Sequence, residues 1–305
     1  MSRLMNMAIG RIDKFLFHDT DASACVRFRI TFAVLLCVYV TVWMLDGTYW
    51  FSDAGVLQTQ TARAMSLSTS FSLFWWIPST PLIVQSLLGL MLIQSVALLI
   101  GLWSRFQIIC ICVLLVSFQN RNPLLMDGED VVIRLFAFYM IFMPLDHSWS
   151  LSRWLRKPSG GEPETSAWAI RLPQVQMTVI YLSAVWSKCL GSTWIDGSAM
   201  FYVYKMSDVF GRGQLPLWLT QSPDVIRLST WSVLLVEAVL PIALWYRPTR
   251  TIAVVVGIML HLSMEYAMHL FLFQWIMIVG LLSFLAVPLR FRSKDTGQAE
   301  RFGLQ

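Results

Sequence analysis

The chain has 305 residues, of which 56% are hydrophobic and 13% are charged, and its mean hydropathy is +0.61. Soluble proteins carry about 25% charged residues, so this composition leaves too little charge to cover a water-facing surface and excludes an ordinary soluble enzyme. The formal net charge of +5 does not indicate nucleic-acid binding, because the basic residues lie between apolar segments, where they set the orientation of membrane spans.

Residues 1–25 are expected to form a cytoplasmic N-terminal segment. Its first part contains Arg3, Arg11, Asp13 and Lys14 and lacks a continuous apolar core, so we expect no cleavable signal peptide. The first apolar run would then act as an uncleaved signal anchor.

Apolar segments recur over residues 26–288 and predict one transmembrane domain, of all-α fold with about eight membrane-spanning helices. A helix needs about 20 largely apolar residues to cross a bilayer, and it satisfies its own backbone polar groups there. The stretch 249–288 is about twice the length of one span, so the chain must turn within it. The expected spans are residues 27–45, 81–102, 104–120, 131–147, 172–190, 228–246, 249–267 and 270–288.

The distribution of basic residues predicts the orientation of this polytopic protein in the cell membrane. Both termini, including a basic tail over residues 289–305, are expected in the cytoplasm, because cytoplasmic loops of membrane proteins are enriched in Lys and Arg. Of the 23 basic residues, sixteen then lie on the cytoplasmic side and seven on the other. The seven outer residues are Arg63, Arg121, Arg134, Lys188, Lys205, Arg212 and Arg227.

Two long segments, residues 46–80 and 191–227, are expected on the outer side. Each contains aromatic residues, among them Tyr49, Trp50 and Trp218. Because Trp and Tyr favour the membrane–water interface, we expect both segments to lie on or dip into it.

Lys188 ends an apolar run that begins near Val179. Two interpretations are open. The lysine anchors the helix by extending its ammonium group to the headgroups, or it is a buried lysine that acts as a general base.

His261, Glu265 and His269 recur at intervals of four and lie on one face of a helix, near the expected turn. They would extend over about 12 Å of helix, so one metal ion cannot touch all three, and no metal site is expected. The stripe is expected to face the interior of the helix bundle, because a charge facing lipid is costly. His261 is also a candidate for contact with a substrate.

Other ionisable residues also fall within or beside predicted spans. Asp130 and Arg134 are four residues apart and are able to pair on a helix, and the acids of residues 127–130 also suit a helix N-terminus. Glu237 lies in the middle of a predicted span and has no evident partner in the sequence.

The stretch from Tyr181 to Met200, YLSAVWSKCLGSTWIDGSAM, is the most informative motif in the chain. It resembles the horizontally transferred transmembrane (HTTM) domain family, whose best-known members are the vitamin K-dependent γ-glutamyl carboxylases. The family shows a Tyr, a Lys seven residues later, and a Trp-x-(Asp/Glu)-Gly turn. The matching residues here are Tyr181, Lys188, Trp194, Asp196 and Gly197. The resemblance extends over roughly residues 20–288.

The resemblance implies catalytic roles for Lys188, as the base, and His261. It implies a reduced quinone, similar to vitamin K hydroquinone, as cofactor, although the residues themselves establish none. The residues expected to bind substrate are Asp130, Arg134, Tyr181, Trp194, Asp196 and Glu265.

The sequence also departs from the carboxylases. The animal enzyme has a His where this chain offers Asp130 or its neighbours, and it continues into a large lumenal domain that holds the peptide substrate, whereas this sequence stops at Gln305. Short bacterial members include a protein needed to mature a secreted peptide toxin. The resemblance therefore implies the fold, and carboxylation to a lesser degree.

Three functions are consistent with these observations, all in a lipid bilayer. The first is a carboxylase-like membrane enzyme, a lyase or oxygenase, that modifies an exported peptide with Lys188 as general base. The second is a non-catalytic membrane factor that helps export or mature a secreted peptide or a small export partner. The third is a small-molecule transporter, which the lack of an inverted repeat disfavours.

Overall fold

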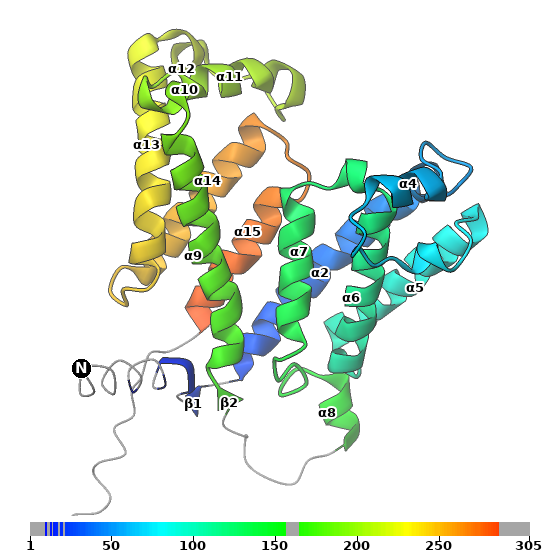
Figure 1. Cartoon of the computed structure of the whole chain (residues 1–305). Helices are drawn as coiled ribbons and strands as arrows, with labels where there is room; N and C mark the ends of the chain where they lie inside the picture. Colours follow the sequence, from blue (N-terminus) through cyan, green and yellow to red (C-terminus); the bar gives the residue numbers. More distant parts are fainter. Residues whose placement is uncertain are drawn as a thin grey trace, which may run out of the picture.

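A computed structural model (Figure 1) describes residues 22–156 and 165–286, together with residues 10, 13, 15–17 and 19–20. The predicted basic tail over residues 289–305 lies outside the described residues, as does most of the predicted N-terminal segment 1–25.

The described chain is helical, apart from a pair of two-residue antiparallel strands, β1 (Asp19–Thr20) and β2 (Thr165–Ser166). Every predicted span overlaps a helix. The long helices are α2 (Ser23–Leu45), α5 (Pro81–Ile100), α6 (Ser104–Arg121), α7 (Gly128–Met140), α9 (Trp168–Cys189), α13 (Pro223–Ala243), α14 (Arg250–Ala267) and α15 (Phe273–Leu282). The short ones are α3 (Gly47–Phe51), α4 (Thr59–Met65), η1 (Leu73–Trp75), η2 (Pro123–Leu125), α8 (Leu151–Arg156), α10 (Ser192–Ile195), α11 (Ala199–Phe210), α12 (Leu217–Gln221) and η3 (Ser283–Ala286).

Four helices, α2, α5, α13 and α14, are long and apolar enough to cross a membrane, by length and composition. The apolar stretch Phe273–Leu285 is shorter. The chain is therefore a membrane protein built from helices. Charged residues within α6, α7 and α9, such as Arg105, Arg134 and Arg171, make these helices less apolar than the four.

Local sequence explains where the helices begin and end. Thr80 caps α5 by accepting a hydrogen bond from the Ile83 amide at 3.4 Å, and α5 ends at Gly101, whose φ of +75° glycine adopts without strain.

Asp127 and Asp130 form a capping box at the start of α7. The predicted span 131–147 is wrong at both ends, because this box starts the helix at Gly128 and the chain leaves the helix after Met140, ahead of Pro144.

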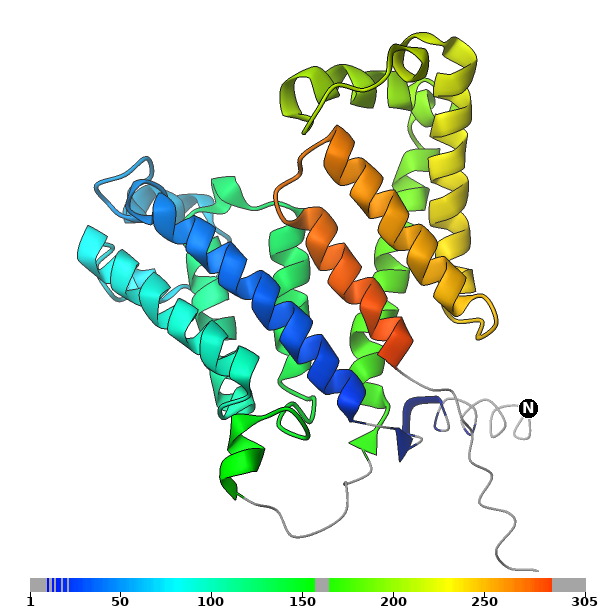
Figure 2. The ribbon, with the colours of Figure 1, turned by 180° about the vertical axis from the view of Figure 1, so that it is seen from behind.

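Two groups of helices lie side by side, as Figures 1 and 2 show. One contains α2, α5, α6 and α7, and the other contains α9, α13 and α14. Helix α15 lies between them and packs against α2, α7, α9 and α14. The short helices α3, α4 and α10–α12 lie at one end of the bundle, so the two predicted outer segments share one end, and α8 and the strands lie at the opposite end.

The core of the first group is aromatic. Phe118 of α6 packs edge-on against Phe51 and Phe74, with ring centroids 5.1 Å away in each case, and Trp43 of α2 packs against the same cluster. These ring contacts pack the segment 46–80 against α2 and α6.

Candidate active site

A cavity of about 660 Å³ lies among α9, α11, α12, α13, α14 and α15. This volume is in the range of sites that bind drug-sized molecules. Apolar side chains dominate its walls, and a few polar groups converge on it. The polar side chains at the cavity include Tyr181, Lys188, Glu237, His261 and Gln274.

Lys188 and Glu237 form an ion pair between Nζ and Oε2 at the wall of this cavity. Lys188 lies in the last turn of α9 and Glu237 in the middle of α13, and the two helices pack together. The side chain of Lys188 is 20% exposed and that of Glu237 is 8% exposed. A carboxylate within an apolar helix is costly unless it is paired, and Lys188 supplies the countercharge.

Trp194 covers the same ammonium group from the other side. The Lys188 Nζ lies 4.9 Å from the centroid of the Trp194 ring, within the range of a cation–π contact. Trp194 reaches this position because α9 ends at Cys189 and the short helix α10 turns back against it.

A second polar chain lines the cavity deeper in the bundle. The Tyr181 hydroxyl lies 2.8 Å from His261 Nε2, and His261 Nδ1 lies 2.5 Å from Gln274 Oε1. Because Gln274 offers a carbonyl oxygen, Nδ1–H donates to it, and Nε2 accepts the Tyr181 hydroxyl proton. Tyr181 and Lys188 are seven residues apart on α9 and therefore lie on the same face, two turns apart.

The remaining residues expected to bind substrate lie elsewhere. Asp130 accepts a hydrogen bond from the Tyr39 hydroxyl and one from the Asp127 amide at 2.9 Å, and the described residues show no ion pair between Asp130 and Arg134. Neither Asp130 nor Arg134 contributes to the cavity wall.

Asp196 and Glu265 are also outside the cavity wall. Asp196 is exposed, and hydrogen bonds from the Ser198 side chain and amide hold the pKa of its carboxyl below the usual value. The described residues show no ion pair between Asp196 and Lys188, and a role of Asp196 in substrate binding stays a prediction.

Glu265 ties the segment 191–227 to α14. Its Oε1 accepts hydrogen bonds from Arg212 Nε at 2.9 Å and Arg212 Nη2 at 2.5 Å, and it lies 3.0 Å from His269 Nδ1. Residues 191–222, called the cap below, include α10, α11 and α12, and α11 and α12 contribute to the roof of the cavity. The Arg212–Glu265 pair thus holds the cap to the bundle.

The expectation for the polar stripe is met in part. His261 and Glu265 are buried, whereas the His269 side chain is 47% exposed. Helix α14 ends at Ala267, so His269 lies in the turn before α15 rather than on the helical face. No group of three His, Cys, Asp or Glu side chains close enough to hold a metal ion occurs in the part of the chain that the structure describes.

Sequence reasoning missed the partner of Glu237. A signal was present, because a carboxylate in the middle of an apolar helix requires a cation, and Lys188 is the lysine that closes a neighbouring span. The sequence carries no signal for Gln274, because its role in orienting His261 depends on the fold.

A helical membrane protein with a largely apolar cavity and an ion pair at its wall is the class that fold and site define together. The HTTM domain matches residues 17–288, so the chain belongs to the HTTM domain family. No curated protein and no solved structure matches it.

Proposed function

We propose that this HTTM-domain protein is a membrane enzyme that removes a proton from a lipid-soluble hydroxy compound of the reduced-quinone class. The observation that carries the proposal is the Lys188–Glu237 pair at the wall of a cavity that is otherwise mostly apolar. An ionisable pair beside an apolar binding volume is a common feature of sites for acid–base chemistry.

The cavity suits a compound of this class by size and by lining. Its volume of about 660 Å³ and its apolar walls fit a bicyclic ring with an attached tail, and the Lys188 Nζ gives that ring one polar contact. A bound reduced quinone supplies an ionisable hydroxyl group and reducing equivalents.

Lys188 performs the proton transfer with Glu237 as its partner. Glu237 Oε2 first takes a proton from the Lys188 ammonium group, which leaves two neutral groups where two charges were costly to bury. The neutral amine Nζ then accepts the proton of the substrate hydroxyl as that O–H bond breaks. The ammonium group that results pairs with the substrate oxygen, and the displaced proton remains on Glu237.

Tyr181, His261 and Gln274 orient the substrate at the other end of the cavity. The hydrogen-bonded chain fixes the His261 ring, and the apolar side chains around it exclude water. Peptide carboxylation, a further step in the resembled carboxylases, is an extension of the proposal in which an exported peptide reaches the cavity from the cap side.

A second candidate function is a non-catalytic membrane factor that binds an exported peptide. The observation in its favour is the exposed apolar surface of the cap, which includes Tyr202, Val209, Phe210, Leu217 and Trp218. Such surfaces often bind partners or membranes.

The experiment uses 1-naphthol, a stable phenol whose anion absorbs at longer wavelengths than the neutral form. Protein in lipid nanodiscs is titrated with the probe at a pH at which the free probe is neutral. We expect the wild-type protein to bind the probe as the anion. The Lys188→Arg variant should bind it in the neutral form, because a guanidinium group does not lose its proton at usable pH.

Lys205→Arg is the matched control, since Lys205 lies on α11 outside the cavity wall. A Lys188→Arg protein that folds and ionises the probe as fully as wild type would remove the base from the proposal. Binding of the neutral probe by both proteins would favour the non-catalytic factor. Mass spectrometry of co-purified quinones then identifies the natural ligand.

The proposal includes about eight spans with both termini in the cytoplasm and the cap outside. The basic asymmetry of the sequence supports this orientation. A Gln214→Cys variant should react with a membrane-impermeant thiol reagent in intact cells, and a Gly160→Cys variant should be protected. The reverse pattern would invert the orientation without affecting the proton-transfer proposal.

A further inference from the structure

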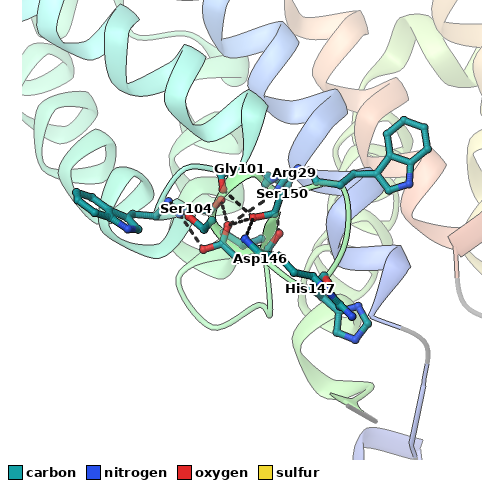
Figure 3. A network of polar contacts seen from close by, with 11 residues as sticks. Arg29, Gly101, Ser104, Asp146, His147 and Ser150 are labelled. Atoms are coloured by element: carbon teal, nitrogen blue, oxygen red, sulfur yellow. Dashed lines mark hydrogen bonds and ion pairs between the residues drawn. The ribbon is translucent and has the colours of Figure 1, made fainter. Parts of the chain in front are cut away.

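A polar network lies at the end of the bundle opposite the cap, between the α5–α6 turn and the segment after α7 (Figure 3). The Asp146 carboxylate accepts hydrogen bonds from the Ser104 amide at 3.1 Å, the Ser104 hydroxyl at 2.5 Å and the Ser150 hydroxyl at 3.2 Å. Arg29 Nη1 lies 3.8 Å from Asp146 Oδ1, and the Arg29 side chain is fully buried. The negative charge of Asp146 is thus balanced from inside the protein.

The network holds two tryptophans in a backbone conformation that side chains rarely adopt. Trp103 has φ +49° and Trp149 has φ +48°. The Trp103 amide donates to Ser152 Oγ at 2.7 Å, and the Trp149 carbonyl accepts from Arg29 Nη2 at 2.5 Å. This backbone strain does not serve to bury the indole rings, because Trp103 is 59% exposed and Trp149 is 85% exposed.

A cleft of about 480 Å³ opens beside these residues, and both Arg105 and Arg156 line it. Both arginines are exposed, and neither forms an ion pair with any residue in the described ranges. Asp146 also borders the cleft, but Arg29 balances its charge. The cleft therefore presents two guanidinium groups that have no ion-pair partner among the described residues.

The geometry points to a binding site for the phosphate of an anionic phospholipid in this cleft, with Arg105 and Arg156 as its ligands. Guanidinium groups bind phosphate oxygens through paired hydrogen bonds. Exposed tryptophans favour the headgroup depth of a membrane, and basic pockets beside spanning helices suit anionic headgroups. Trp103 and Trp149 therefore identify the source of the phosphate as a lipid rather than a soluble anion. This site is separate from the cavity that holds Lys188.

The experiment compares full-length protein in nanodiscs of phosphatidylcholine with and without phosphatidylglycerol, and retained lipid is measured by native mass spectrometry. The Arg105→Gln/Arg156→Gln double variant should bind phosphatidylglycerol about 25-fold more weakly than wild type, at about fivefold for each arginine. Arg63→Gln/Arg227→Gln, which removes two exposed arginines at the cap end, should bind it as wild type does.

A Trp103→Gly variant separates lipid binding from stability. Glycine adopts the φ of this position without strain, so the variant should melt at the same or a higher temperature yet retain less phosphatidylglycerol. If the double arginine variant retains as much phosphatidylglycerol as the wild-type protein, the proposed site is overturned. Displacement of the lipid by inorganic phosphate at equal concentration identifies a soluble-anion site and overturns the assignment to a lipid.

Discussion

Two ion pairs, one in each group of helices, contain the same kinds of charge but differ in how deeply the cation is buried. Arg29 is fully buried, and the carbonyls of Leu145 and Trp149 accept its hydrogen bonds beside Asp146. Lys188 is 20% exposed at the wall of a large cavity beside Glu237. A cation that is packed on all sides, such as Arg29, stabilises a fold, whereas a cation beside an open volume, such as Lys188, is able to react with what enters that volume.

The chemistry of arginine and lysine agrees with this difference between the two ion pairs. Arginine keeps its proton under all usable conditions and binds several acceptors at fixed angles. Lysine presents one compact group that is able to lose its proton. The first group of helices uses arginine again at the end where α3 and α4 lie, where Arg121 pairs with Asp53 at 3.1 Å and donates to the Leu57 carbonyl at 2.7 Å.

The largest effect is expected at Glu237. Glu237→Gln keeps the shape of the side chain but removes the group that takes the proton from Lys188. We expect the ionised fraction of bound 1-naphthol to fall by about 100-fold or more. Glu129→Gln, at a buried carboxylate outside the cavity wall, is the control and should leave ionisation unchanged. If Glu237→Gln and Glu129→Gln reduce the ionised fraction of the probe equally, Glu237 has no special role in the proton transfer.

Arg29→Met should have the opposite pattern, with lost stability and unchanged ionisation of the probe. Removal of Arg29 leaves Asp146 without its countercharge and two carbonyls without their donor, and we expect the free energy of unfolding to fall by about 3 kcal/mol. Thermal unfolding in detergent measures it. Arg63→Met, at an exposed arginine of α4, should change stability by less than about 0.5 kcal/mol. A stable Arg29→Met protein would contradict the structural role.

Tyr181→Phe tests the deeper polar chain with a smaller expected effect. The change leaves His261 Nε2 buried without its donor, which should reduce stability by about 1–2 kcal/mol and weaken probe binding severalfold. Tyr204→Phe is the matched control, because Tyr204 also lines the cavity and its hydroxyl has no hydrogen bond among the described residues. Similar results for the two variants would show that the contact with His261 is unimportant.

The smallest effect is expected at the cap. Arg212→Gln removes a half-exposed ion pair with Glu265, so the cap should open more often and the probe should dissociate about two to five times faster. Stopped-flow absorbance measures that rate. Arg227→Gln, an exposed arginine at the start of α13, should leave it unchanged. An unchanged rate in Arg212→Gln would show that the Arg212–Glu265 pair does not control access to the cavity.

The sequence by itself determined the class of protein and the approximate position of each long helix. The length of an apolar run, an N-cap such as Thr80 and a C-cap such as Gly101 are all local features of the chain, so the sequence alone reveals them. The turn between α14 and α15 was expected for the same reason, since one membrane span cannot hold residues 249–288. Lys188 and His261 stood out because ionisable residues are costly within apolar runs.

Only the tertiary structure decided which of these residues meet. Lys188 and Glu237 are 49 positions apart, and Tyr181 and His261 are 80 apart, on helices whose packing no local pattern specifies. The fold joins these four around one cavity and leaves Asp130 and Glu265 in other contacts. Helix formation depends on neighbours in the chain, whereas a site depends on how side chains from several helices pack together, which is a property of the whole bundle.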